Sequence, residues 1–252
     1  MTAITASGGF SIGRVVQRMV DAIGANLGPF LLISALLGGL PTLLSGAAQI
    51  AGFSPILIGL LALLIVVLQI WGTFLLQAAL IIGAMSHMDG ERSSLSDWVS
   101  KGLKHWWRVF LVDLLAGLII GAASMLLFVP GVVMATRYVA ATPALICENL
   151  RVNPALARSA KLTAGRRWAI FGLFLLYVTP IFVAEALLVT LAASSPGGFV
   201  KAMGSPLARL VLLPAVNTLI PMITAVGAAA LYAELRIGRE SAGSMNIAKV
   251  FD

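Results

Sequence analysis

Charged residues are scarce in this chain. Asp, Glu, Lys and Arg make up 11% of its 252 residues, whereas soluble domains carry about 25%. Apolar residues make up 60%, and the mean hydropathy is +1.00. A water-soluble globule of this length needs a charged surface that so few residues cannot form, so lipid must solvate much of the chain. The composition therefore predicts one integral membrane domain over residues 1–252, with no separate aqueous domain.

Cysteine, histidine and catalytic motifs are also lacking. The single cysteine, Cys147, excludes an intrachain disulfide, and the two histidines, His87 and His105, fall in one predicted loop. The sequence contains no HExxH, CxxC, GxSxG or Walker motif. The acidic residues near His87 lie in Asp89–Arg92, which is typical of a solvated turn rather than a metal site. We therefore expect no enzyme, no metal and no cofactor.

Long apolar runs take the place of the missing charge. A helix needs about 20 apolar residues to cross the hydrocarbon, and residues 22–88 contain no Asp, Glu, Lys or Arg. The N-terminus lacks the pattern of a cleaved signal peptide, so we expect the first apolar segment to act as an uncleaved anchor. Turn residues divide the chain into six predicted spans, at about 27–48, 56–85, 109–129, 132–148, 168–193 and 207–234. The fourth is short and carries a charge, so a re-entrant segment is the alternative there.

Basic residues are distributed unevenly among the loops. With the N-terminus in the cytoplasm, 14 of the 17 Lys and Arg residues lie inside, Lys201 and Arg209 lie outside, and Arg137 lies within a span. This asymmetry predicts that both termini are cytoplasmic. The net charge of +7 is then explained by topology and anionic lipid, so we expect no nucleic-acid partner.

An amphipathic segment precedes each predicted hairpin. The segments cover about 11–24, 94–106 and 153–164, and in each the apolar residues recur at helical spacing. We expect three helices in the cytoplasmic interface, each followed by two spans, so the predicted fold is an all-α bundle of three hairpins. Two explanations stay open, a threefold internal repeat and independent selection of such helices at the interface.

The second amphipathic segment offers a candidate face for a partner or the membrane surface. Leu95 and Trp98 lie on its apolar side, and Lys101 and Lys104 lie on its polar side. Two clusters of tryptophan and arginine are typical of anchors at the headgroup level and could contact lipid headgroups. They are Trp106, Trp107 and Arg108 before the third span, and Arg166, Arg167 and Trp168 before the fifth.

Three charged residues fall within predicted spans. Arg137 and Glu185 lie at similar estimated depths below the outer end, so we expect them to pair. A structural pair is favoured over an ion or substrate site because the two charges cancel. Asp113 lies near the inner end of its span, where we expect it to reach the interface or to pair with a neighbour such as Arg108.

Residues 130–174 resemble a known family. The resemblance rests on Pro130-Gly131, Arg137-Tyr138, Pro143-Ala144-Leu145, Glu148, Asn153, Ala155-Leu156, Ser159, Leu162-Thr163, Gly165, Trp168 and Phe171. This pattern is similar to that of bacterial YciC-like membrane proteins and of the membrane domain fused to glycerophosphoryl diester phosphodiesterases. The resemblance implies a bacterial inner-membrane protein and no particular activity, because the soluble phosphodiesterase domain is absent.

The expected function is a non-catalytic structural, assembly, lipid-binding or partner-binding subunit. Membrane lipids, a protein partner or a second copy of the chain are the expected partners. The alternative is a transporter or channel for a small solute or lipid. A continuous polar cavity joining Arg137, Glu185 and Asn217 would favour the alternative.

Overall fold

The computed structural model describes residues 10–51, 53–91, 93–194, 201–202 and 204–251. Side chains are not described at residues 55, 181, 184, 185, 188, 191, 192 and 240–251. Helices account for 89% of the structure, and the described ranges contain no strand. The predicted all-α class is therefore confirmed.

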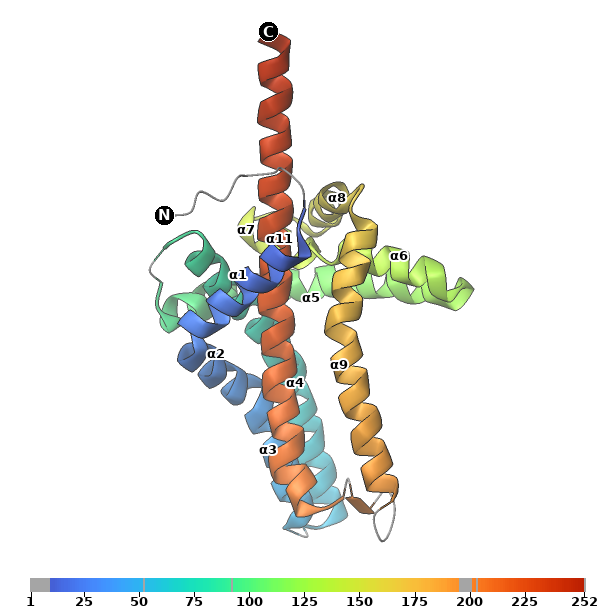
Figure 1. The fold of residues 1–252 in the computed structure, drawn as a ribbon. Coiled ribbons are helices and arrows are strands. Elements are labelled where there is room, and N and C mark those ends of the chain that lie inside the picture. Colours follow the sequence, from blue (N-terminus) through green and yellow to red (C-terminus); the bar gives the residue numbers. More distant parts are fainter. Residues whose placement is uncertain (1–9, 52, 92, 195–200, 203, 252) are drawn as a thin grey trace.

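Four long helical stretches run in similar directions along the molecule (Figure 1). The first joins α2 (Leu27–Ser34), the π-helical turn η1 (Ala35–Gly39) and α3 (Leu40–Ile50). The others are α4 (Pro55–Met88), α9 (Arg167–Ala193), and the π-helical turn η2 (Ala208–Leu212) continued by α11 (Leu213–Phe251). The C-terminal end of α11 extends beyond the rest of the fold.

A further pair of helices runs across the long ones. α5 (Leu95–Leu126) and α6 (Phe128–Tyr138) form a hairpin whose tip projects sideways (Figure 1). The short helices α1 (Ile12–Ala25), α7 (Ala141–Cys147) and α8 (Val152–Thr163) lie at the end that the C-terminal half of α11 passes through.

The structure does not confirm six spans. Among the described residues, five helical stretches are long and apolar enough to cross a membrane: Leu27–Ile50, Ile56–Met88, Leu95–Leu126, Phe128–Cys147 and Ala208–Arg239. In α9, the described apolar part is the shorter stretch Arg167–Pro180. The predicted fourth span, 132–148, is divided between α6 and α7, with a turn at residues 139–140. The predicted arrangement of three parallel hairpins differs from the crossed α5–α6 pair.

Helices form at all three predicted amphipathic segments, but one is not separate. α1 and α8 agree with the predicted ranges to within one residue, whereas α5 continues from Leu95 to Leu126 without a break near residue 107. No glycine or proline lies between Lys104 and Ala116, so the backbone has no reason to stop there. Ser94 and Asp97 form a capping box that fixes only the start of this helix.

The packed core lies toward one end of the molecule. Residues 75–85 of α4, except Gln77, are buried and pack with Phe30, Trp98 and the alanine-rich part of α11. Lower on α4, by contrast, large apolar side chains such as Leu60, Leu63 and Val67 are more than half exposed. Exposed apolar surface on this scale is unstable in water, so these faces are lipid-facing and the protein is membrane-embedded.

Glycines allow α11 to approach the first long stretch closely. A Cβ at Gly38 would overlap the carbonyl of Asn217, one at Gly39 would meet the Thr218 hydroxyl, and one at Gly46 would lie 2.6 Å from the Arg209 carbonyl. Small residues at helix crossings let backbones meet, which is how membrane helices gain packing energy without a hydrophobic driving force.

Candidate functional site

A nine-residue stretch of α11, residues 231–239, connects the elements at the packed end of the molecule. We call this stretch the junction segment. It follows an alanine-rich region in which Ala225, Val226, Ala229 and Ala230 are buried. Because these side chains are small, neighbouring helices come close enough to α11 for polar groups on the next two turns to reach them.

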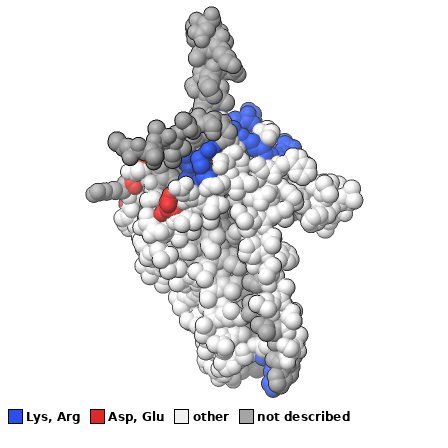
Figure 2. Space-filling model, viewed as in Figure 1, with Lys and Arg blue, Asp and Glu red and all other residues white. Residues whose placement is uncertain are grey.

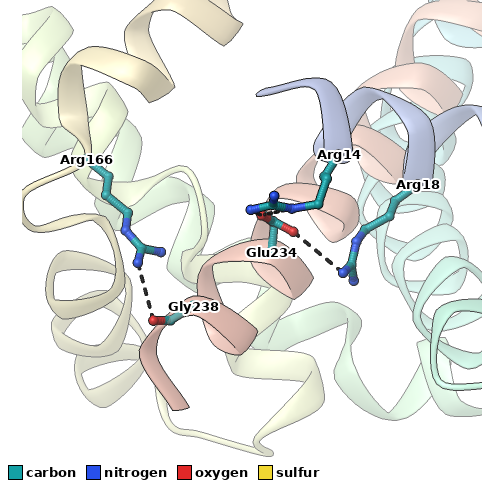
Figure 3. Close-up of polar contacts among 5 residues, drawn as sticks. All are labelled: Arg14, Arg18, Arg166, Glu234 and Gly238. Carbon is teal, nitrogen blue, oxygen red and sulfur yellow. Dashed lines mark hydrogen bonds and ion pairs between the residues drawn. The ribbon is translucent and has the colours of Figure 1, made fainter. Parts of the chain in front are cut away.

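Glu234 of the junction segment is held by two arginines of α1. Its carboxylate accepts a hydrogen bond from Arg14 Nε at 2.7 Å and lies 3.5 Å from Arg18 Nη2. Arg14 and Arg18 are four residues apart, so both side chains leave α1 on one face and reach the same carboxylate (Figure 3). The Glu234 residue is 3% exposed, and an unpaired carboxylate at such a position would be costly. The interaction therefore fixes α1 across α11.

Tyr232 connects the junction segment to the α7–α8 linker. Its hydroxyl donates a hydrogen bond of 2.8 Å to Glu148, and the same carboxylate accepts one of 2.7 Å from Arg158 Nε on α8. The linker turns at Asn149, which has a φ of +49°, a conformation that asparagine tolerates better than most residues. This turn brings Glu148 and Arg158 together.

The remaining groups of the segment contact two linkers and the start of α9. Arg236 Nη2 lies 3.9 Å from Asp89 in the α4–α5 linker. The carbonyl of Gly238 accepts a hydrogen bond of 3.3 Å from Arg166, which precedes α9 (Figure 3). Arg239 donates two hydrogen bonds of 2.8 Å to carbonyls at residue 161, in the last turn of α8, and at residue 164, just after it. A cation thus caps the C-terminal end of α8, as the helix dipole favours.

Basic side chains gather on the side of the molecule that carries this segment. Figure 2 shows them at the end with α1 and α8, above a surface that is almost free of charge until basic atoms appear again at its far end. Arg209 in η2 and Arg239 in α11 are 30 residues apart in one helical column, about 45 Å at 1.5 Å per residue. A bilayer with its headgroups is about 40–45 Å thick, so the two ends match the two headgroup layers.

Three side chains of the predicted anchor clusters differ in exposure. Trp168 at the start of α9 is 86% exposed, whereas Trp107 is about half exposed and stacks on Phe110, with ring centroids 5.1 Å apart. Trp106 packs edge-on against Trp71 at 6.3 Å. Arg108 donates a hydrogen bond of 2.9 Å to Asn149. The first cluster is therefore partly used in helix packing, while Trp168 stands free of the bundle.

The predicted partner face on the first turns of α5 is divided between core and surface. Trp98 is buried against Phe30, with ring centroids 5.3 Å apart, and Leu95 packs on the same core. Lys101 and Lys104 are exposed. Only the lysine side of this helix is thus open to a partner.

The predicted pair of Arg137 and Glu185 stays a prediction. The side chain of Glu185 lies outside the described residues. The Arg137 guanidinium lies 5.6 Å from the ring of Tyr138, and its buried Nε has no hydrogen-bond partner among the described atoms. Its carbonyl accepts a hydrogen bond of 2.8 Å from Ser159 of α8.

Asp113 is placed differently from the prediction. Among the described contacts it does not pair with Arg108; instead, the Thr142 hydroxyl of α7 donates a hydrogen bond of 2.5 Å to it, and Gln77 of α4 is a second partner. Asp113 therefore joins α5 to α7 and α4.

Sequence reasoning missed Glu234, Glu148 and Tyr232. Glu234 was treated as the end of a span, and Arg14 and Arg18 were counted only among the basic residues of the cytoplasmic side. One available signal was the pattern itself: a single carboxylate in an apolar run, together with two arginines four residues apart on a helix that lies on the same membrane side.

No family model, curated protein or solved structure matches the chain. Across the described residues, no three His, Cys, Asp or Glu side chains are grouped so that they could hold a metal ion. The arrangement can therefore be interpreted only from its own geometry, which is a set of ion pairs and caps that fixes helices at one membrane face.

Proposed function

We propose that this chain is a non-catalytic membrane protein that acts as a structural or assembly subunit and binds lipid or a protein partner at its basic end. The observation that carries the proposal is the junction segment. Its Tyr232, Glu234, Arg236 and Arg239 side chains each contact a different neighbouring element. Charged groups held in this way stabilise one arrangement of helices rather than exchanging partners during a transport cycle.

The proposal includes an orientation. The basic end, with both termini, would face the cytoplasm of a bacterial inner membrane. The uneven distribution of Lys and Arg supports this, because basic residues are retained on the cytoplasmic side. The YciC-like resemblance of residues 130–174 supports the bacterial location and, as part of the proposal, membership in that family.

A transporter or channel is the second candidate. It is favoured by Asp113, whose contacts with Thr142 and Gln77 place a carboxylate among apolar helices, where ionisable groups often serve transport. Among the cavities of the described residues, one is lined by Arg158 and Arg239 and another by Gln49 and Arg209. They lie at opposite ends of the α11 column, and the buried alanine-rich part of α11 lies between them, which favours the first candidate.

The test compares retention of partners with transport. The protein would be extracted in mild detergent, analysed by native mass spectrometry, and reconstituted into liposomes for uptake assays with a panel of small ions and metabolites. We expect retained lipid or a stoichiometric protein partner, and uptake equal to that of empty liposomes. Uptake that exceeds this background and is abolished by Asp113→Asn would overturn the proposal and establish the second candidate.

A further inference from the structure

A basic cavity lies where α8, the α8–α9 linker and α11 meet. It has a volume of about 330 Å³ and is lined by Arg158, Lys161, Leu162, Ala164 and Arg239. Three of the five lining residues are cations, and none is acidic. Glu148 compensates the charge of Arg158, whereas Lys161 and Arg239 contact only neutral groups in the described structure. The cavity therefore carries excess positive charge.

Unsatisfied donors adjoin the cavity. Arg166 packs against Gly238, the residue before Arg239. A Cβ added at Gly238 would lie 2.5 Å from Arg166 Nη1, so this guanidinium lies next to the turn of α11 that carries Arg239. Arg166 Nη1 and Arg167 Nε are buried and have no hydrogen-bond partner among the described atoms. Buried guanidinium donors without an acceptor are uncommon and costly. In the cavity itself, an anion with several oxygens, such as a phosphate ester, would accept hydrogen bonds from the exposed cations Lys161 and Arg239.

Apolar surroundings distinguish a lipid from a free anion. Leu162 and Ala164 form part of the cavity wall. Four residues after Ala164, Trp168 is 86% exposed, and the exposed side chains that follow on α9 include Phe174, Leu175 and Leu176. Tryptophan prefers the headgroup level, and an apolar helix below it offers a surface for acyl chains. A free phosphate would use the cations but not these side chains.

We propose that this cavity binds the phosphate of an anionic phospholipid headgroup, with the acyl chains along α9. Lys161 and Arg239 hold the phosphate, Arg166 adds positive charge from the α8–α9 linker, and Trp168 marks the level of the glycerol. This site would be the place where the protein binds lipid in the proposed function. It rests on that function in one respect, that the basic end faces a membrane leaflet.

The test measures lipid retention in native mass spectra of protein released from nanodiscs. Nanodiscs would contain phosphatidylcholine with phosphatidylglycerol, and the variants would be Lys161→Gln and the control Arg151→Gln, which removes one positive charge from the exposed residue before α8. We expect selective retention of phosphatidylglycerol by the wild type and the control. One membrane-facing lysine contributes about 1 kcal/mol to anionic lipid binding, so Lys161→Gln should weaken retention about fivefold.

Three results would overturn the inference. Equal retention of the two lipids would show that no headgroup is selected. Equal losses in Lys161→Gln and Arg151→Gln would show attraction to the whole basic surface. Displacement of the lipid by millimolar inorganic phosphate would assign the cavity to a soluble anion. None of these results changes the two readouts that test the proposed function, which are retention of a protein partner and the absence of uptake. Failure of the lipid site can therefore be distinguished from failure of the proposed function.

Discussion

Replacing Glu234 by glutamine keeps the shape of the side chain and removes the charge that Arg14 and Arg18 share. The arginine side chains are 37% and 31% exposed, so water can partly solvate them after the change. We therefore expect a loss of unfolding free energy on the order of 1–3 kcal/mol, below the 3–5 kcal/mol typical of a fully buried pair. Thermal unfolding in detergent would measure it.

The matched control is Asp21→Asn, an equal loss of one negative charge on the exposed side of α1. It should change stability by less than about 0.5 kcal/mol. A Glu234→Gln variant as stable as this control would mean that the two arginines do not hold the carboxylate.

Gly38 tests the close crossing of the first long stretch with α11. A Cβ at this position would overlap the Asn217 carbonyl, which belongs to the backbone and cannot move aside cheaply. Gly38→Ala should therefore destabilise the protein by about 1–3 kcal/mol. At Gly59 no atom lies within 4 Å of the added Cβ, so Gly59→Ala should be neutral or stabilise by up to about 1 kcal/mol. Equal melting temperatures for the two variants would exclude the close crossing.

Single residues were the least predictable part of the site. The sequence identified basic anchors because Trp168 and its neighbouring arginines are recognisable by composition and by their place next to a span. It did not identify the partner of Glu234, since Arg14 is 220 positions away and nothing local specifies that α1 will cross α11. The same absence of long-range information left Asp113 without its contact to Thr142.

At the scale of helices, α1 should behave as a docked element with one protected face. Val15 and Ala22 are buried, whereas Gln17 and Asp21 are exposed. In a background with Cys147 replaced by serine, cysteines at the first two positions should react slowly with a membrane-permeant maleimide, and cysteines at the other two should react fast. Combining Val15→Cys with Glu234→Gln should raise its labelling rate, because the arginine contact is lost. Uniform labelling along α1 would contradict docking.

Helix boundaries were predictable where the sequence contains a physical stop or start. α1 and α8 were located to within one residue because an apolar stripe follows a start signal in each. The predicted boundary near residue 107 was wrong because it was drawn at a change from polar to apolar composition. Such a change marks the boundary between an aqueous and an apolar environment. A helix ends where the sequence supplies a cap, a glycine or a proline, and α5 has none of these near residue 107.

At the scale of the whole molecule, the α5–α6 hairpin decides how many helices cross the bilayer. Its tip is apolar and open, with Met125 at 91% and Leu127 at 68% exposure. If the hairpin lies across the long helices as in Figure 1, a spin label at Leu127→Cys should reside in the leaflet nearest the basic end. A label at the depth of the opposite headgroups would restore the predicted parallel hairpin. The distribution of basic residues in the loops cannot distinguish a hairpin that crosses the bilayer from one that lies across the long helices, because in both cases the two ends of the hairpin lie on the same side.

Membrane orientation can be tested at positions on opposite ends of the fold. Asn153 lies at the start of α8 and Ser54 precedes α4, and both are exposed. With Cys147 replaced by serine, a cysteine at Asn153 should react with an impermeant maleimide only after the inner membrane is opened, and one at Ser54 should react in intact spheroplasts. The reverse result would invert the proposed topology.

The position of the junction segment in the chain has a consequence for biogenesis. α1, the α4–α5 linker, the α7–α8 linker and the start of α9 all find partners on residues 231–239, which leave the ribosome after every one of them. Until residues 231–239 are synthesised, these contacts cannot form for Arg14, Arg158 and Arg166. Assembly of this face must therefore finish after translation of α11, and an interruption of synthesis before residue 231 would release a chain whose surface helices remain undocked and open to proteolysis.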